Sequence, residues 1–154
     1  MRRSSSGISP VVATVILVAI AIVIAIAVAF WASGLVGVFT RFEKIEITSA
    51  YFNPNAGTNG AVVLYVKNTG SSSATIDDIY VNGVPLNRAT VTTSGGSCTT
   101  SGLTNAIARC SPGQNVTIQI DTYDGTNEWI SGVTYEVAVH TASGKLYPAS
   151  VLIP

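Results

Sequence analysis

A long apolar segment near the N-terminus constrains this 154-residue chain more than any other feature. Residues 7–40 include no charged side chain, and residues 11–31 are apolar at every position except Thr14. About 20 helical residues span a bilayer core of roughly 30 Å. The apolar part of a secretory signal peptide has only about 7–15 residues. The segment is therefore long enough to anchor the chain in a membrane or to join it to other copies.

The local sequence leaves a choice between strand and helix. Residues 19–29 read AIAIVIAIAVA, which alternates in size and is rich in the β-branched residues that favour strands. In lipid, an unpaired strand would leave its backbone groups without partners, at several kcal/mol each, whereas a helix satisfies them internally. Ser9 suits an N-cap, and Pro10 suits a first turn because its missing N–H would have no partner there. We therefore predict a helix from about Pro10 to about Phe39.

One face of this helix carries small side chains at a regular spacing of four. They are Ala21, Ala25, Ala29, Ser33 and Gly37. Small residues allow helix backbones to approach closely, so the pattern predicts a helix-packing stripe. The alternative is that alanine is simply common in apolar helices.

The charges flanking the segment predict its orientation in a membrane. Arg2 and Arg3 precede it, whereas the two basic residues within residues 41–46 are matched by two glutamates. An excess of Lys and Arg marks the cytoplasmic side. We therefore expect the N-terminus in the cytoplasm and the rest of the chain outside.

Residues 45–154 are expected to form one β-rich domain. Seven runs with strand character are separated by turn clusters such as NPNAGTNG and SPGQ. The runs are EKIEITSAYF, AVVLYVKN, ATIDDIYVN, RATVTT, QNVTIQID, GVTYEVAVH and KLYPASVLI. No segment after residue 44 has helical periodicity. We predict an α+β fold, with a long N-terminal hydrophobic α-helix followed by an immunoglobulin-like antiparallel β-sandwich head that is soluble and monomeric by itself.

The sequence offers little for catalysis or nucleic-acid binding. It contains 8 basic and 8 acidic residues without a basic cluster, which argues against a nucleic-acid partner. The G-x-S-x-G, H-E-x-x-H and phosphate-loop motifs are absent. His140 is a lone strand histidine, and the adjacent Asp77 and Asp78 are expected on opposite faces of a strand. We therefore expect no enzymatic activity, no cofactor and no metal.

Two further features suit a head that lies outside the cytoplasm, where a disulfide between the two cysteines is favoured. Cys98 and Cys110 flank a turn-rich loop, and a disulfide between them would contribute roughly 3 kcal/mol. Two buried free thiols are the alternative. Asn115 begins the sequon Asn115-Val116-Thr117, which predicts an N-glycosylation site in an organism that has the machinery.

The segment GISPVVATVILVAIAIVIAIAVAFW resembles the N-terminal region of archaeal type IV pilins. The shared elements are a short basic leader ending in Gly, a small-Pro-Val start and an unbroken aliphatic helix. The head segment LYVKNTGSSSATIDDIYVNG also looks like those of archaeal pilins and related extracellular sandwich domains. The resemblance implies the major subunit of an adhesion pilus, a homopolymer at the cell surface whose helices form its core. It also implies residence in the cytoplasmic membrane before assembly.

The resemblance further implies a prepilin peptidase, a membrane platform protein and an assembly ATPase as partners. Bacterial pilins carry Glu at the fifth mature position, where this chain has Val12, and this favours the archaeal branch. Archaeal flagellins begin with a Gly-Ile-Gly-Thr-Leu-like segment, whereas this chain has ISPVVATVIL, which favours a pilus. The alternatives are an archaellum filament subunit, a minor pilin and a single-span, membrane-anchored extracellular binding module.

The resemblance also predicts proteolytic processing. Matched onto this chain, the cut falls between Gly7 and Ile8, which gives a cleaved basic leader (1–7), an assembly or transmembrane helix (8–44) and the extracellular head (45–154). Cleavage removes Arg2 and Arg3, so no side-chain charge would precede Arg41. Intact-mass analysis of native filaments is expected to find a subunit that begins at Ile8. A subunit that begins at Met1 would contradict this prediction.

Overall fold

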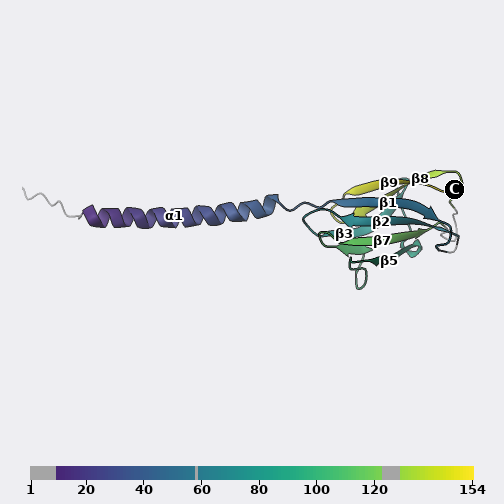
Figure 1. The fold of residues 1–154 in the computed structure, drawn as a ribbon, viewed down its shortest axis with the longest axis horizontal. Coiled ribbons are helices and arrows are strands. Elements are labelled where there is room, and N and C mark those ends of the chain that lie inside the picture. The colour runs from purple at the N-terminus through teal and green to yellow at the C-terminus, as the bar shows by residue number, and fades with distance from the viewer. Residues whose placement is uncertain (1–9, 58, 123–128) are drawn as a thin grey trace, which may run out of the picture. The chain divides into compact units, whose positions relative to one another are not determined.

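The computed structural model describes residues 10–57, 59–122 and 129–154, and the chain divides into two compact units, residues 1–40 and 41–154. The first unit contains helix α1 (Pro10–Phe39), and the second is built from antiparallel strands (Figure 1). The predicted α+β fold is confirmed. The predicted helix bounds are also confirmed, because an unbroken run of helix-compatible apolar residues follows Pro10.

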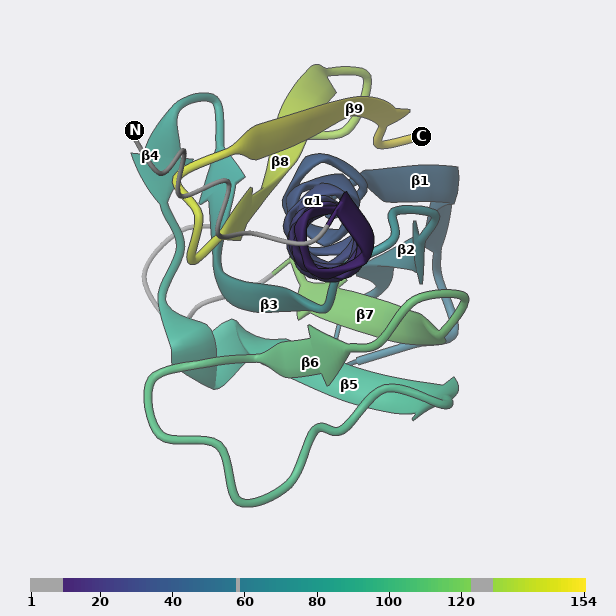
Figure 2. The ribbon, with the colours of Figure 1, turned by 90° about the vertical axis from the view of Figure 1, so that its left-hand side faces the viewer.

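The second unit, the head, consists of two antiparallel sheets (Figure 2). Its elements are β1 (Ile45–Asn53), β2 (Ala61–Asn68), β3 (Ala74–Val81), β4 (Val84–Pro85), the 3-10 helix η1 (Arg88–Thr90), β5 (Val91–Gly96), β6 (Ala108–Cys110), β7 (Asn115–Asp121), β8 (Thr134–Thr141) and β9 (Leu146–Leu152). One sheet has the order β1-β2-β7-β5. The other has the order β4-β3-β8-β9, and β6 also pairs with β3.

The core lies between the two sheets and follows the alternation of apolar side chains along the strands. In β2, Val62, Leu64 and Val66 are each at most 1% exposed, and the intervening Val63, which points to the opposite face, is also buried. β7 contributes every second residue in the same way, and β3, β8 and β9 supply the facing layer. The main contributors from these strands are Val116, Ile118, Ile120, Ile76, Ile79, Val137, Val139 and Val151.

The chain enters the head through hydrogen bonds to the β2–β3 loop. Phe42 N–H donates to Ser71 Oγ at 3.0 Å, and Phe42 O accepts from the Ser71 and Ser72 amides at 2.9 and 3.1 Å. Lys44 O accepts from the amides of Thr69 and Gly70. Residues 42–44 are therefore bound to the head although they precede β1.

A buried asparagine is hydrogen-bonded to this loop. Asn68 is fully buried, and its Nδ2 donates to Ser72 O at 2.8 Å and to Cys110 O at 2.9 Å. Its Oδ1 accepts from Gly70 N–H at 2.9 Å. Both amide hydrogens and the oxygen thus have partners, as a buried amide requires. The loop is consequently fixed to both β2 and β6.

Cys98 and Cys110 form a disulfide, with their Cα atoms 4.5 Å apart. Cys110 ends β6 and is fully buried, whereas Cys98 is half-buried in the segment after β5. The backbone groups of Thr99 and Arg109 pair beside the bridge at 2.8 and 2.9 Å. The disulfide and this pairing together close the long loop between β5 and β6.

Replacement of Gly70 by alanine is expected to destabilise the head by about 1–3 kcal/mol, the cost of overpacking a tight site. A Cβ at this position would lie 2.5 Å from Phe42 O and 2.6 Å from Lys44 N, so the entering chain would have to move. Urea unfolding of residues 41–154, followed by the fluorescence of Trp129, measures the loss. The matched control Ser73→Ala in the same loop should change stability by less than about 0.5 kcal/mol. Equal stability of the two variants would contradict the prediction.

Reduction of the disulfide is expected to destabilise the head by roughly 3 kcal/mol, because the reduced unfolded chain gains conformational freedom. Urea unfolding of the same protein with and without reductant measures the difference without changing the sequence. Alkylation of the native, unreduced protein should modify neither Cys98 nor Cys110. Two readily alkylated thiols would show that the bridge does not form.

Candidate functional site

The most unusual surface of the molecule is that of α1. None of its 30 residues, all of which the structure describes, is buried. Large apolar side chains are exposed around the whole helix, including Val11, Leu17, Val23, Phe30 and Trp31, with exposed fractions of 66–76%. Extended apolar surfaces of this kind mark contacts with a membrane or with other protein chains.

The few polar side chains of α1 are already hydrogen-bonded. Thr14 Oγ1 donates to Val11 O at 2.8 Å, and Ser33 Oγ donates to Ala29 O at 2.8 Å. Apart from the indole N–H of Trp31, the sequence of α1 contains no other polar or charged side-chain group. Polar groups cost free energy on burial only when they lack partners. The helix can therefore be enclosed on every side by lipid or protein at little polar cost.

The length of α1 matches that of a membrane span. At 1.5 Å per residue, its 30 residues extend about 45 Å. The hydrocarbon core of a bilayer is about 30 Å thick, and the bilayer is roughly 40–45 Å thick with its headgroups. By length and composition, α1 is able to cross a membrane.

All five residues of the predicted small-residue stripe lie within α1: Ala21, Ala25, Ala29, Ser33 and Gly37. Residues four apart follow one of the ridges that helices use in packing, so the stripe winds gradually around α1. A Cβ added at Gly37 would meet no atom within 4 Å in the described structure. The stripe is therefore free for another helix, and its use as a packing face stays a prediction.

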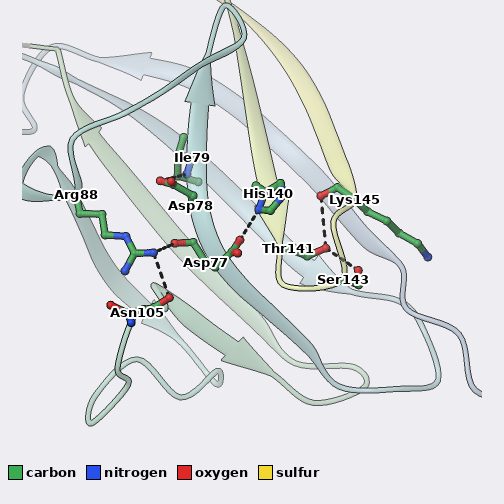
Figure 3. A network of polar contacts seen from close by, with 9 residues as sticks. All are labelled: Asp77, Asp78, Ile79, Arg88, Asn105, His140, Thr141, Ser143 and Lys145. Atoms are coloured by element: carbon green, nitrogen blue, oxygen red, sulfur yellow. Dashed lines mark hydrogen bonds and ion pairs between the residues drawn. The ribbon is translucent and has the colours of Figure 1, made fainter.

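The lone histidine belongs to a polar network across the second sheet (Figure 3). His140 Nδ1 lies 2.6 Å from Asp77 Oδ1, and its ring stacks obliquely on Tyr80, with centroids 5.5 Å apart. Arg88 Nη2 donates to the backbone oxygens of Asp77 and Asn105. The contacts connect β3, β8 and η1. The network holds these neighbouring elements together by hydrogen bonds.

A β-bulge explains why the network was not predicted. Ile76 and Ile79 are both fully buried although they are three residues apart, because the pairing of β3 with β8 shifts between Ile76 and Asp78. Strict alternation is interrupted here, and the two carboxylates have different partners: Asp77 Oδ1 contacts His140, whereas Asp78 Oδ1 accepts from Ile79 N–H at 2.9 Å. Both aspartates are half-buried outside the core. The three-residue spacing of the isoleucines is the sequence signal that could have revealed the bulge.

The remaining predicted sites differ in what the structure says of them. Asn115 is exposed at the start of β7, where its Oδ1 accepts from Ser97 Oγ at 3.3 Å. Gly7 and Ile8 lie outside the described residues. Among the described residues, no group of three or more His, Cys, Asp or Glu side chains could hold a metal ion.

The outer face of the first sheet carries an exposed aromatic pair. Tyr51 of β1 and Tyr65 of β2 are 40% and 42% exposed, and their ring centroids are 6.3 Å apart. A hydrogen bond with the Tyr65 side chain raises the pKa of Tyr51 above its ordinary value. The sequence alone does not reveal this pair, because it depends on the pairing of two strands.

Two solved structures resemble the chain at low sequence identity. No protein-family model and no curated protein matches the chain. Among solved structures, the archaellum periplasmic stator protein FlaG from Sulfolobus acidocaldarius is 18% identical, with a TM-score of 0.49 over 71% of this chain and 99% of that chain. The structure of the Iho670 flagellar-like filament is 15% identical, with a TM-score of 0.42 over 94% and 98%. At these values neither similarity assigns a function to this chain.

Proposed function

We propose that this chain is the structural subunit of an archaeal type IV adhesion pilus and polymerises through α1. The observation that carries the proposal is the apolar surface of α1, which is exposed along its whole length and carries no charged side chain. The head, in contrast, closes a core of its own between two sheets. In such a chain, the apolar surface of α1 is covered first by membrane lipid and afterwards by a bundle of identical helices.

The energetics favour a stable polymer. Burial of each valine or isoleucine is worth about 1.5–3 kcal/mol relative to water, so α1 does not return to water once it is enclosed. Lipid tails are as apolar as the helix, so the exchange of lipid for protein depends on close packing of small residues. Because α1 carries no charge, added salt should affect its packing little.

The steps before polymerisation follow from the resemblance to archaeal pilins. The head lies outside the cell while α1 is held in the cytoplasmic membrane, and a prepilin peptidase cuts between Gly7 and Ile8. A membrane platform protein and an assembly ATPase then drive the helix into the filament. The exposed Asn115 is the proposed attachment point for an N-linked glycan on the filament surface.

A second candidate is a single-span, membrane-anchored binding module. α1 fits it equally well, and the exposed Tyr51–Tyr65 pair would serve as a contact surface. Isolation of surface filaments separates the two candidates. In a pilus, the filament consists of many copies of this chain, whereas an anchored module stays in the membrane fraction as single copies.

Replacement of Ala25 by leucine tests the packing stripe. The larger side chain would overpack a close helix crossing, at roughly 1–3 kcal/mol per subunit, and the cost recurs throughout the polymer. Electron microscopy should show fewer filaments, while circular dichroism of the head stays unchanged.

Val23→Leu provides the matched control for this experiment. Two residues along a helix correspond to a rotation of about 200°, so Val23 lies on the face nearly opposite Ala25 and receives the same new side chain. This variant should assemble like the wild type. Normal assembly of both Ala25→Leu and Ala29→Leu would show that the stripe does not mediate packing.

A further inference from the structure

We propose that the head contains a binding site for a phosphate group where the chain enters it, and that membrane lipids supply this phosphate before assembly. The site is a cleft of about 260 Å³ lined by Arg41, Ser71, Ser72, Ser73 and Pro112. A water molecule takes up roughly 30 Å³ of liquid, so a phosphate group and several waters fit together. The choice of a lipid source rests on the membrane-anchored stage of the proposed function.

The walls of the cleft are fixed before any ligand arrives. The β2–β3 loop is attached to Phe42 by three hydrogen bonds and to the buried Asn68 by two. The turn that carries Pro112 is held by the amide of Gly113, which donates to Asn68 O at 2.9 Å, and by Ser111 N–H, which donates to Gln114 Oε1 at 2.8 Å. A preformed cleft does not have to be ordered by its ligand, and this favours binding.

Arg41 gives the cleft its chemical preference. It is exposed, and within the described part of the chain its side chain has no ion pair or hydrogen bond. A guanidinium group offers a planar fork of N–H donors that matches the oxygens of a phosphate. Ser72 and Ser73 also line the cleft, and their hydroxyls are short hydrogen-bond donors. A cleft that combines a guanidinium group with serine hydroxyls is suited to a phosphate group.

The charge around the cleft supports the same ligand. All 8 acidic residues of the sequence lie after residue 40, whereas Arg2 and Arg3 precede α1, so the head has more acidic than basic groups. The end of the head that carries the cleft has more basic than acidic residues. The basic residues there are Arg41, Lys44, Lys67 and Lys145, and the acidic residues are Glu43 and Glu46. A local excess of positive charge attracts anions to a head that is acidic overall.

The position of Arg41 along the chain points to lipid as the source. Arg41 is the second residue after the end of α1, so it lies within about 7 Å of that end in any orientation of the head. A helix about 45 Å long has nearly the thickness of a bilayer with its headgroups, roughly 40–45 Å. A membrane-spanning α1 therefore places Arg41 in the outer headgroup layer, where lipid phosphates lie. Assembly would release this contact when α1 leaves the membrane.

Amide-resolved NMR of the full chain in dodecyl maltoside micelles, which contain no phosphate, tests the site. Inorganic phosphate and glycerophosphate are titrated separately, with sodium chloride at equal ionic strength as the control. Saturable shifts are expected for residues 41–44 and 69–73 with both phosphates and not with chloride. Arg41→Gln should weaken binding about tenfold, as expected for the loss of a charge-assisted hydrogen bond. Arg88→Gln, at a cation outside the cleft, should bind like the wild type.

A second arm identifies the source of the phosphate. The full chain is placed in nanodiscs of phosphatidylglycerol or of digalactosyl diacylglycerol, which has no phosphate. In the wild type, the chemical shifts of the same amides should differ between the two lipids. In Arg41→Gln, they should be the same in both lipids. If the soluble phosphates cause shifts but the two lipids give the same amide shifts, lipid is not the source of the phosphate. The absence of saturable shifts in both arms, or shifts that depend only on protein concentration, would overturn the site. Neither arm requires filaments, so a phosphate-binding chain that fails to polymerise would refute the pilus alone.

Discussion

α1 exposes apolar side chains around its whole circumference, and water is the one environment in which such a surface is unstable. This constraint governs the rest of the molecule. The helix carries no charge that would hold it at an interface, and its two hydroxyls are bonded to its own backbone. Lipid and a bundle of like helices satisfy the same surface equally well. That equivalence allows a single helix to serve as an anchor at one stage and as a polymer core at another.

The head differs from the helix because it is a compact unit with a core of its own. Its two sheets enclose an apolar core, and its buried amide Asn68 has partners for every hydrogen-bonding group. The entering segment is fixed to the head from Phe42 onward, where Gly70 allows two backbones to approach closely. The core of the head is thus built from its own strands.

Features that depend on local composition were predictable from the sequence. The bounds of α1 and the seven long strands follow from apolar runs and turn clusters. The short strands β4 and β6 were missed because two or three residues carry no periodic signal. Residues 88–90 form a 3-10 helix rather than a strand, because Asn87 Oδ1 caps them by accepting from Ala89 N–H at 3.1 Å.

Features that depend on pairing between distant segments were not predictable. The Asp77–His140 contact joins residues from β3 and β8, and it exists because a bulge interrupts the alternation that the sequence suggests. The cleft at Arg41 combines three segments that are far apart along the chain. No local pattern in any one of them reveals the others. Charge and hydropathy thus predicted the two parts of the chain, whereas the sites within the head required the structure.

The central claim is that cohesion between subunits resides in α1. Sedimentation of the full chain and of residues 41–154, after removal of detergent and under identical conditions, tests it most directly. If α1 provides the cohesion, the full chain sediments as filaments, while the head alone stays monomeric and β-rich by circular dichroism. Filaments formed by residues 41–154 alone would contradict it, because strand exchange between heads would then be the contact that builds the polymer.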